Sequence, residues 1–264
     1  MSDPLPILFN ADASCAPVKE SKQRACVIVA HHAGLFSLIN KVITCAELYE
    51  HVHVDFSNGT LYSKEGDNLW NHLFEPTENR GGDVIEAYPH QGYTYKNVAD
   101  HYVRDNAWRY RLNLLWRRFA TLPSIANRVE ADVEDCDIQE CVAVQVRSIP
   151  HAGEQLTGES QTLDRYAQAI ESAGGGHVFA VCSDQSTVDW LAARFDVTSY
   201  PNTRRSPDRT VNFHEVAPQT VEDAVQCFKE VMVMSHAKAL VHPISNMATA
   251  ALYMNPTLKS IYLP

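Results

Sequence analysis

The second half of this chain alternates short apolar runs with amphipathic segments, and this alternation constrains the fold more than any other feature. The apolar runs are rich in β-branched residues, and the segments between them repeat apolar residues at helical spacing. Such runs indicate parallel strands joined by crossover helices. The predicted strands are 141–147, 177–184, 196–200, 238–243 and 258–263, and the predicted helices are 162–173, 185–195, 220–237 and 245–254. We therefore predict an α/β fold with a doubly wound parallel sheet.

A shorter unit of the same kind stands near the start of the chain. The run ACVIVA at 25–30 indicates a buried strand, the segment 35–50 has helical periodicity, and VHVDF at 52–56 indicates a second strand. This is a strand–helix–strand crossover. The sequence from 57 to 120 is less regular. Its clearest predicted element is a helix at 101–119, and we expect the arginines of this helix to form a solvated face.

A cluster of carboxylates, EADVEDCDIQE at 130–140, predicts an exposed connection between two domains. We accordingly divide the chain into a loose arm at 1–24, an N-terminal α/β domain at 25–135 and a more regular C-terminal domain at 136–264. Thr162 is the expected cap of the helix at 162–173.

Charge and composition exclude several classes of protein. The formal net charge of −10 argues against a nucleic-acid binder with a general basic surface. No basic segment followed by an apolar stretch marks a secretory signal, and no apolar run is long enough for a membrane span, so we expect a cytoplasmic protein. The seven cysteines form no CxxC pair, which favours buried free thiols. The histidines match no zinc spacing, and we expect no metal site.

Ligand chemistry should lie where the C-terminal strands end, because open parallel sheets bind ligands outside the carboxyl ends of their strands. A phosphate at the start of the helix at 245–254 would meet backbone N–H groups and the positive end of the helix dipole. An arginine beside it could add a bidentate contact. The residues that we predict to line this edge are Arg147, Ser183, Asp184, His242, Ser245 and Asn246.

Each of these residues also has a purely structural interpretation. Asp184 is suited to a ribose or sugar hydroxyl but also to capping the helix at 185–195, and Ser245 with Asn246 can be no more than a helix cap. Arg147 can pair with a surface acid, and His242 can be a buried imidazole with both nitrogens satisfied. The arginines at 204–205 and Arg209 are weaker phosphate candidates, for which a solvated loop is the alternative.

The first strand ends in the loop HHAG, which contributes His31 and His32. If the two units pack face to face, these side chains face the same cleft. A histidine there could serve as a general base, because its pKa lies near neutral pH.

Several segments resemble fucosyltransferase-like enzymes, which include α1,6-fucosyltransferases, nodulation fucosyltransferases and protein O-fucosyltransferases. The resemblance covers 25–76 and 141–262 and rests on order and spacing. The segments are AGLFSLINKVITCAELYEHVHVDFSNGTLY, GDNLWNHLFEP, VAVQVRS, CSDQSTVDWLAARF and MSHAKALVHPISNMATAALYMNPTLKSIYL. It implies the GT-B-like architecture of two Rossmann-like, doubly wound domains, the second of which binds a nucleotide-sugar.

The resemblance also implies roles for residues. The Arg of the family's His-x-Arg motif maps to Arg147, while Gln145 stands in place of the His. The nucleotide-contacting acid maps to Asp184, and the Ser-rich segment maps to Ser245 and Asn246. Some relatives carry the acceptor-activating group in the opening loop, which places it at His32 or His31.

The resemblance thus implies a metal-independent glycosyltransferase without a cofactor that moves a sugar from a nucleotide-sugar donor, with GDP-fucose favoured. The expected reaction is an inverting displacement by an acceptor hydroxyl of a glycan, a small molecule or a protein. Gln145 favours an alternative, a catalytically inactive protein of the same fold that binds a nucleotide or a partner. A further alternative is another doubly wound enzyme, such as a phosphatase or nucleotide hydrolase.

Overall fold

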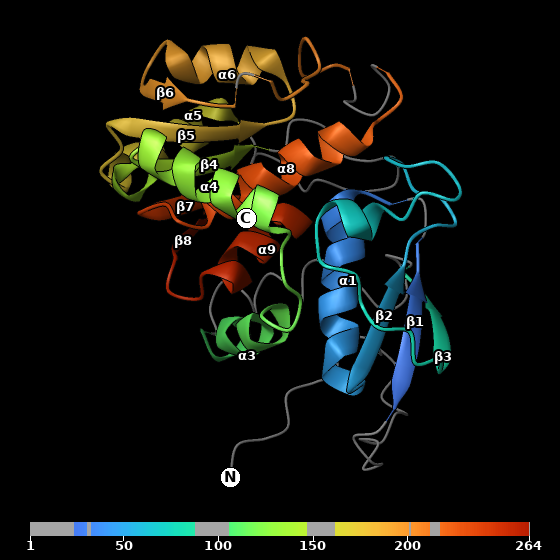
Figure 1. Ribbon diagram of the computed structural model, residues 1–264. Coiled ribbons are helices and arrows are strands. Elements are labelled where there is room, and N and C mark those ends of the chain that lie inside the picture. Colours follow the sequence, from blue (N-terminus) through green and yellow to red (C-terminus); the bar gives the residue numbers. More distant parts are fainter. Residues whose placement is uncertain are drawn as a thin grey trace.

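The computed structural model of the protein describes residues 24–30, 33–87, 106–146, 162–200, 202–211 and 217–263. It contains two parallel sheets, of three and five strands, with helices between and around them (Figure 1). Both the α/β class and the parallel sheets predicted from the sequence are confirmed.

The larger sheet belongs to the C-terminal half and has the strand order β6-β5-β4-β7-β8. Its strands are β4 (Val142–Val146), β5 (His177–Cys182), β6 (Asp196–Thr198), β7 (Ala239–His242) and β8 (Lys259–Tyr262). Counted within this sheet the order is 3-2-1-4-5, so the direction of winding reverses between β4 and β7. Such a reversal opens a crevice at the carboxyl ends of the two strands.

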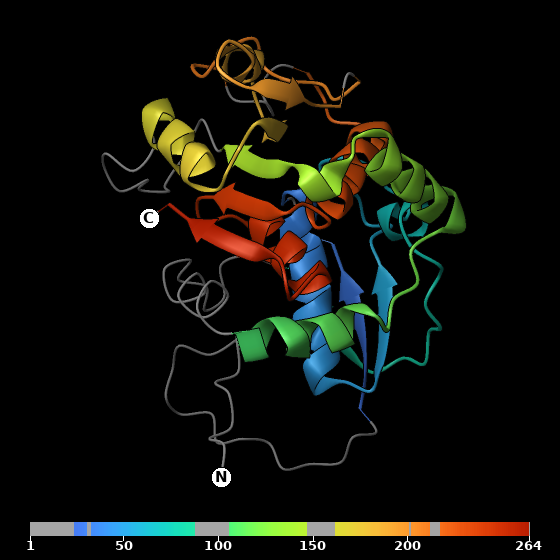
Figure 2. The same ribbon diagram turned by 90° about the vertical axis from the view of Figure 1, so that its left-hand side faces the viewer.

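Helices cover both faces of this sheet (Figures 1 and 2). One face packs on α5 (Leu163–Ser172) and α6 (Gln185–Ala192), and the other packs on α8 (Val221–Met234) and α9 (Asn246–Met254). Side chains alternate along β4: Val142, Val144 and Val146 join the α5–α6 core, whereas Ala143 joins the core on the α8–α9 side. Because strand side chains alternate with a period of two, Gln145 also belongs to the α8–α9 face.

The smaller sheet has the order β2-β1-β3. It is formed by β1 (Ala25–Val29), β2 (His51–Asp55) and β3 (Asp83–Glu86), and β1 is followed by α1 (Leu35–Leu48). Gly82 leads into β3 with a φ of +111°, and a Cβ atom there would lie 1.9 Å from the carbonyl oxygen of Ala25. Only glycine therefore allows the chain to enter β3 this close to β1.

The two halves share one hydrophobic core. A continuous cluster of buried side chains joins the smaller sheet and α1 to β4, β5, α8 and α9. Phe228 of α8 lies at the junction, 6.2 Å from Phe36 of α1 and 5.1 Å from Phe74, between ring centroids. Helix α1 lies between the two sheets (Figure 1). The remaining elements are η1 (Leu69–His72), α3 (Asn106–Trp116), α4 (Pro123–Asp135) and η2 (Ile138–Glu140).

Most predicted strands and helices are confirmed, but the prediction for the segment between the two halves of the chain was incomplete. The acidic segment 130–140 is largely exposed, as predicted, but it is helical: it contains the second half of α4 and the turn η2, and its Asp132 is buried. Helix α4 and strand β3 were not predicted. Thr162 does occupy the cap position of α5, but its side chain makes no capping hydrogen bond.

The arginines near α3 follow the solvated face that the sequence suggested only in part, because Arg117 and Arg118 are exposed and Arg109 is not. Arg109 is buried and donates to the carbonyl of Leu258. Arg118 donates to the carbonyls of Ala46, Tyr49 and Glu50, at the end of α1. A cation at this position satisfies carbonyls that the helix leaves open and complements its dipole.

Within the described part of the chain, no helix is both long and apolar enough to cross a membrane. The described cysteines are free thiols, and four of them are buried: Cys26, Cys45, Cys141 and Cys182. Burial raises the pKa of Cys45 and of Cys141, each to about 11, so these thiols behave as apolar core residues.

Candidate functional site

The carboxyl ends of β4 and β7 bring together two residues that are a hundred positions apart, at the point where the winding of the sheet reverses. The Ser245 hydroxyl donates to the Gln145 side-chain oxygen at 2.9 Å and accepts from the Ala248 backbone N–H at 3.0 Å. Ser245 is thus the N-cap of α9, and Gln145 holds it against β4. The remaining N–H groups of a helix's first turn point away from the helix, which makes such a position suitable for an anion.

Asn246, the first residue of α9, connects the two halves of the molecule. The side-chain nitrogen of Asn40, on α1, lies 3.1 Å from both the backbone and the side-chain oxygen of Asn246. The Tyr253 hydroxyl donates to the side-chain oxygen of Asn40 at 3.0 Å. Asn40 is only 4 % exposed, so this is a buried polar link. Phe36 of α1 also stacks on Phe228 of α8. The Asn40–Asn246 link and this ring contact place the first half of α1 beside the start of α9.

The end of β5 contributes Ser183 and Asp184. The Asp184 carboxylate accepts from the backbone N–H and the hydroxyl of Thr187 and from the Ser186 hydroxyl, at 2.7–2.9 Å. Asp184 has 0 % exposure, so the structure shows the capping role that the sequence left as the alternative. A nucleotide contact of this carboxylate stays a prediction. Ser183 is half-buried, and its carbonyl accepts from Ser206.

His242 ends β7 as a buried imidazole. Its Nδ1 lies 2.9 Å from the carbonyl of Pro243, and its Nε2 lies 2.8 Å from the hydroxyl of Ser260. Burial lowers the pKa of His242 to about 4, with a smaller contribution from the nearby charge of Arg109. The ring is therefore neutral at pH 7 and holds β7 to β8. This is the structural interpretation of His242, and a nucleotide contact stays a prediction.

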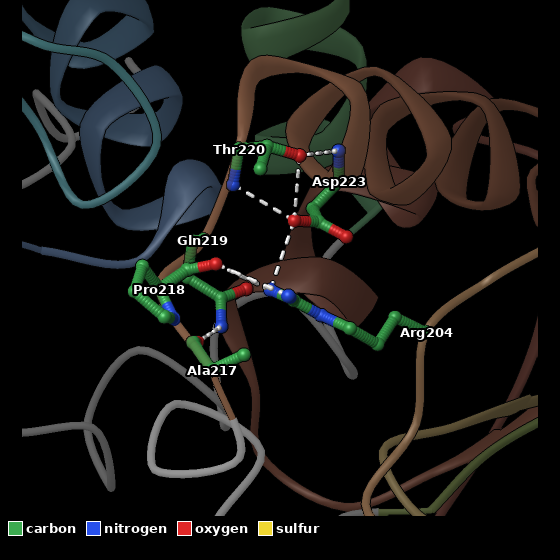
Figure 3. Close-up of polar contacts among 6 residues, drawn as sticks. All are labelled: Arg204, Ala217, Pro218, Gln219, Thr220 and Asp223. Atoms are coloured by element: carbon green, nitrogen blue, oxygen red, sulfur yellow. Dashed lines mark hydrogen bonds and ion pairs between the residues drawn. The ribbon is translucent and has the colours of Figure 1, made fainter.

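The two arginines after β6 are held in ion pairs. Figure 3 shows the Arg204 guanidinium at the start of α8, where it donates to the carbonyl of Pro218 and the carboxylate of Asp223. Asp223 and Thr220 form a reciprocal capping box there. Arg205 is buried rather than solvated and faces Glu230 of α8 at 3.5 Å. Burial raises the pKa of Glu230 to about 7, against the opposing effects of the Thr203 hydroxyl and of Arg205.

Three predicted site residues, His31, His32 and Arg147, lie outside the described residues. The chain on the N-terminal side of His31 is fixed by Asn58. The Asn58 side chain accepts from the Ala30 N–H at 3.1 Å and donates to the Ala30 carbonyl at 2.8 Å. Helix α1 begins at Leu35, and its cap, Gly34, has no side chain to satisfy the first turn.

Sequence reasoning missed two residues that organise this region, Asn40 and Asn58. Asn40 carried a usable signal: it is the one strongly polar side chain among the apolar positions of 35–46 that face the core. A polar residue on an apolar helix face needs a buried partner. No group of three or more histidine, cysteine or acidic side chains within the described ranges is arranged to hold a metal ion.

Comparisons with known proteins connect this geometry to a known fold. No family model matches the sequence, and no curated protein matches it either. Among solved structures, an α-1,6-fucosyltransferase called NodZ, soaked with GDP-fucose, matches with a TM-score of 0.55 and 15% identity over 88% of this chain and 93% of its own. The same enzyme co-crystallised with GDP gives 0.56 and 16%, over 88% of this chain and 92% of its own. The chain has the fold of these fucosyltransferases.

The NodZ structure from Bradyrhizobium matches equally, with a TM-score of 0.55 and 15% identity over 88% of this chain and 92% of its own. The resemblance inferred from sequence order is therefore confirmed at the level of the fold, including the GT-B-like arrangement. Identities this low establish architecture and leave the reaction of this chain to be argued from its own residues.

Proposed function

We propose that this protein is a glycosyltransferase that binds a nucleotide-sugar in the crevice between β4 and β7 and transfers the sugar to an acceptor hydroxyl. One observation carries the proposal: the start of α9, capped by Ser245 at the reversal of the sheet, lies beside the first half of α1. This arrangement supports a site in which an anionic leaving group at α9 faces an acceptor held on the side of α1. Solved structures of the same fold contain GDP or GDP-fucose, which makes GDP-fucose the proposed donor.

The proposed reaction is a single displacement. The acceptor oxygen attacks the anomeric carbon, the bond from that carbon to the diphosphate oxygen breaks, and the sugar inverts. The acceptor proton goes to His32 or His31, and the bonding electrons leave with the diphosphate. Arg147 and the first-turn N–H groups of α9 stabilise the growing negative charge, so that a metal ion is not needed.

A binding protein without transferase activity is the second candidate. The observation that favours it is the neutral amide of Gln145 at the crevice, together with the internal contacts that occupy Asp184 and His242. The second candidate binds a nucleotide or a partner, and only the first candidate requires cleavage of the bond between sugar and diphosphate.

Thermal shift with GDP, UDP, ADP and their sugars tests binding, because a ligand that binds only the folded state raises the melting temperature. Release of GDP from GDP-fucose then separates the enzyme from the binding protein. We expect Arg147→Ala to lower the rate of sugar release by about 100-fold or more without changing the melting temperature of the free protein, as for removal of one transition-state donor.

Arg147→Lys is the matched control, which keeps the charge but removes the bidentate geometry, and it should retain part of the rate. An unchanged rate in Arg147→Ala would remove this residue from the mechanism. Binding without release by the wild-type chain would favour the second candidate.

A further inference from the structure

The residue that follows β1 is held by a side chain from the loop after β2. The backbone pairing of β1 with β2 ends at Val29 and Asp55. One residue further along β1, the Asn58 side chain accepts from the Ala30 N–H at 3.1 Å and donates to the Ala30 carbonyl at 2.8 Å. The amide of Asn58 therefore takes the place that a further residue of β2 would occupy beside β1.

Hydrogen bonds and a glycine fix the position of Asn58 within its loop. On one side, the Asp55 carboxylate accepts from the backbone N–H and the hydroxyl of Ser57, at 3.1 and 2.6 Å. On the other side, Gly59 has a φ of +91°, which lets the chain turn directly after Asn58. The Gly66 N–H then closes the loop by donating to the Ser57 carbonyl at 2.7 Å. A closed loop thus presents the Asn58 side chain to β1.

The same loop, residues 57–66, also reaches the start of α1. Tyr62 is only 7 % exposed, and this burial raises the pKa of its hydroxyl, whereas a hydrogen bond from the backbone N–H of Leu35 acts in the opposite direction. Leu35 is the first residue of α1, and the cap before it, Gly34, has no side chain to satisfy the first turn. One loop therefore contacts the residues on both sides of the turn from β1 to α1, Ala30 and Leu35.

The contact between Asn58 and Ala30 fixes a direction more than it adds stability. Asn58 is exposed, and a hydrogen bond at an exposed position replaces one with water, so it adds little to the stability of the fold. Two hydrogen bonds to a single residue do, however, fix the direction in which the chain leaves β1. The proposed base follows Ala30 by one or two residues, and a base acts only within hydrogen-bond reach of the proton that it removes.

We propose that Asn58 is a positioning residue for the transfer reaction, which holds Ala30 so that the base at position 31 or 32 is directed at the acceptor hydroxyl. Asn58 acts through Ala30 and is assigned no contact with the substrates. The inference rests on the proposed function, since it requires a base in the segment that follows β1. It extends the acceptor side of the site to the loop after β2.

Substitutions of Asn58 test this role against a matched control. Asn58→Ala removes both hydrogen bonds to Ala30. Asn58→Asp keeps an oxygen for the Ala30 N–H but places a carboxylate against the Ala30 carbonyl, and it serves if the alanine variant does not fold. The control is Asn113→Ala, because the Asn113 side chain also makes two hydrogen bonds to backbone, to the carbonyls of Tyr253 and Met254 at 2.8 and 2.9 Å, which join α3 to α9. Asn113 is buried, so its loss should cost at least as much stability.

The measurements are the release of GDP from GDP-fucose, with water as the acceptor, and calorimetric titration with GDP. We expect Asn58→Ala to lower kcat by about 10- to 100-fold, because a misplaced base loses most of its effect, while KM and the affinity for GDP stay unchanged. The wild-type rate should fall as the pH drops below about 6.5 and the base is protonated. The rate of Asn58→Ala should depend less on pH over this range, whereas Asn113→Ala should match the wild type in kcat, KM and pH dependence.

The outcomes separate this inference from the proposed function. If the wild type releases no GDP from GDP-fucose, the transferase is refuted and this inference fails with it. If the wild type releases GDP and a folded Asn58→Ala does so at the same rate, Asn58 does not position the base and the proposed function stands; the same result from Asn58→Asp decides the matter if the alanine variant is unfolded. An equal loss of rate in Asn113→Ala, or an unchanged pH dependence in Asn58→Ala, would also overturn the inference, because either result means that Asn58 serves only the fold.

Discussion

Replacing Phe228 with alanine tests whether the two sheets form one cooperative unit. Phe228 is fully buried in α8, and its ring contacts Phe36 of α1, Phe74 after η1 and Trp116 of α3, with centroid separations of 6.2, 5.1 and 6.1 Å. The first two partners belong to the N-terminal half, whereas α8 covers the larger sheet. Removing this ring therefore opens a cavity at the junction itself.

The expected cost follows from burial and packing. Truncating a buried phenylalanine to alanine costs about 3–5 kcal/mol, from lost transfer free energy and the cavity that remains. We expect about 4 kcal/mol for Phe228→Ala because rings from three elements surround it and cannot all collapse inward. At about 2–4 °C per kcal/mol for a chain of this size, the melting temperature should fall by about 8–16 °C.

Urea unfolding followed by tryptophan fluorescence and by far-UV circular dichroism measures this change. Both probes should give one coincident transition, in the wild type and in the variant. Leu114→Ala is the control, because Leu114 is 68% exposed on α3 and should cost less than about 0.5 kcal/mol. A loss below about 1.5 kcal/mol for Phe228→Ala, or two separate transitions in the wild type, would refute the shared core.

Two further predictions concern the buried polar groups. Asn40→Ala and Tyr253→Phe should each destabilise the fold by about 1–3 kcal/mol, and a double-mutant cycle should show a coupling of about 0.5–1.5 kcal/mol; additive effects would contradict their hydrogen bond. The folded pKa of His242, about 4, lies below its ordinary value of 6.5, so its contribution to stability is present above pH 6.5 and is lost as the pH falls toward 4. The free energy of unfolding should fall by about 3 kcal/mol by pH 4 because of His242, and His242→Gln should make the free energy of unfolding less dependent on pH below 6.5. If the variant loses stability in acid as the wild type does, protonation of His242 is not the cause.

The sequence pattern predicted an element correctly where its apolar residues are also the ones that the folded protein buries. The strands of the larger sheet are buried on both faces, so they appear as continuous apolar runs that are easy to recognise. The helix predicted at 220–237 is observed as α8, and the structure adds a reciprocal capping box between Thr220 and Asp223 at its start. Strand β3 was missed because three of its four residues are exposed and carry no apolar pattern. Its place is set by the close approach at Gly82.

The alternatives at the candidate site could not be separated from sequence. An aspartate after a strand is equally suited to a ligand and to a helix cap, and only the contacts of Asp184 with Thr187 show that it is a cap. The same holds for His242, whose two ring nitrogens meet Pro243 and Ser260. Both outcomes depend on partners brought close by folding.

The sequence by itself determined the parallel α/β class and the order of the C-terminal elements, and it predicted the edge at which a ligand would bind. These follow from periodicity and from the rule that strand ends gather at one edge, both of which are local or topological. Tertiary structure alone decided that Asn40 meets Asn246, that Ser245 rests on Gln145 and that one core joins the two sheets. Those contacts join residues that lie 100 or more positions apart, and no local propensity encodes which distant group will satisfy a buried polar atom.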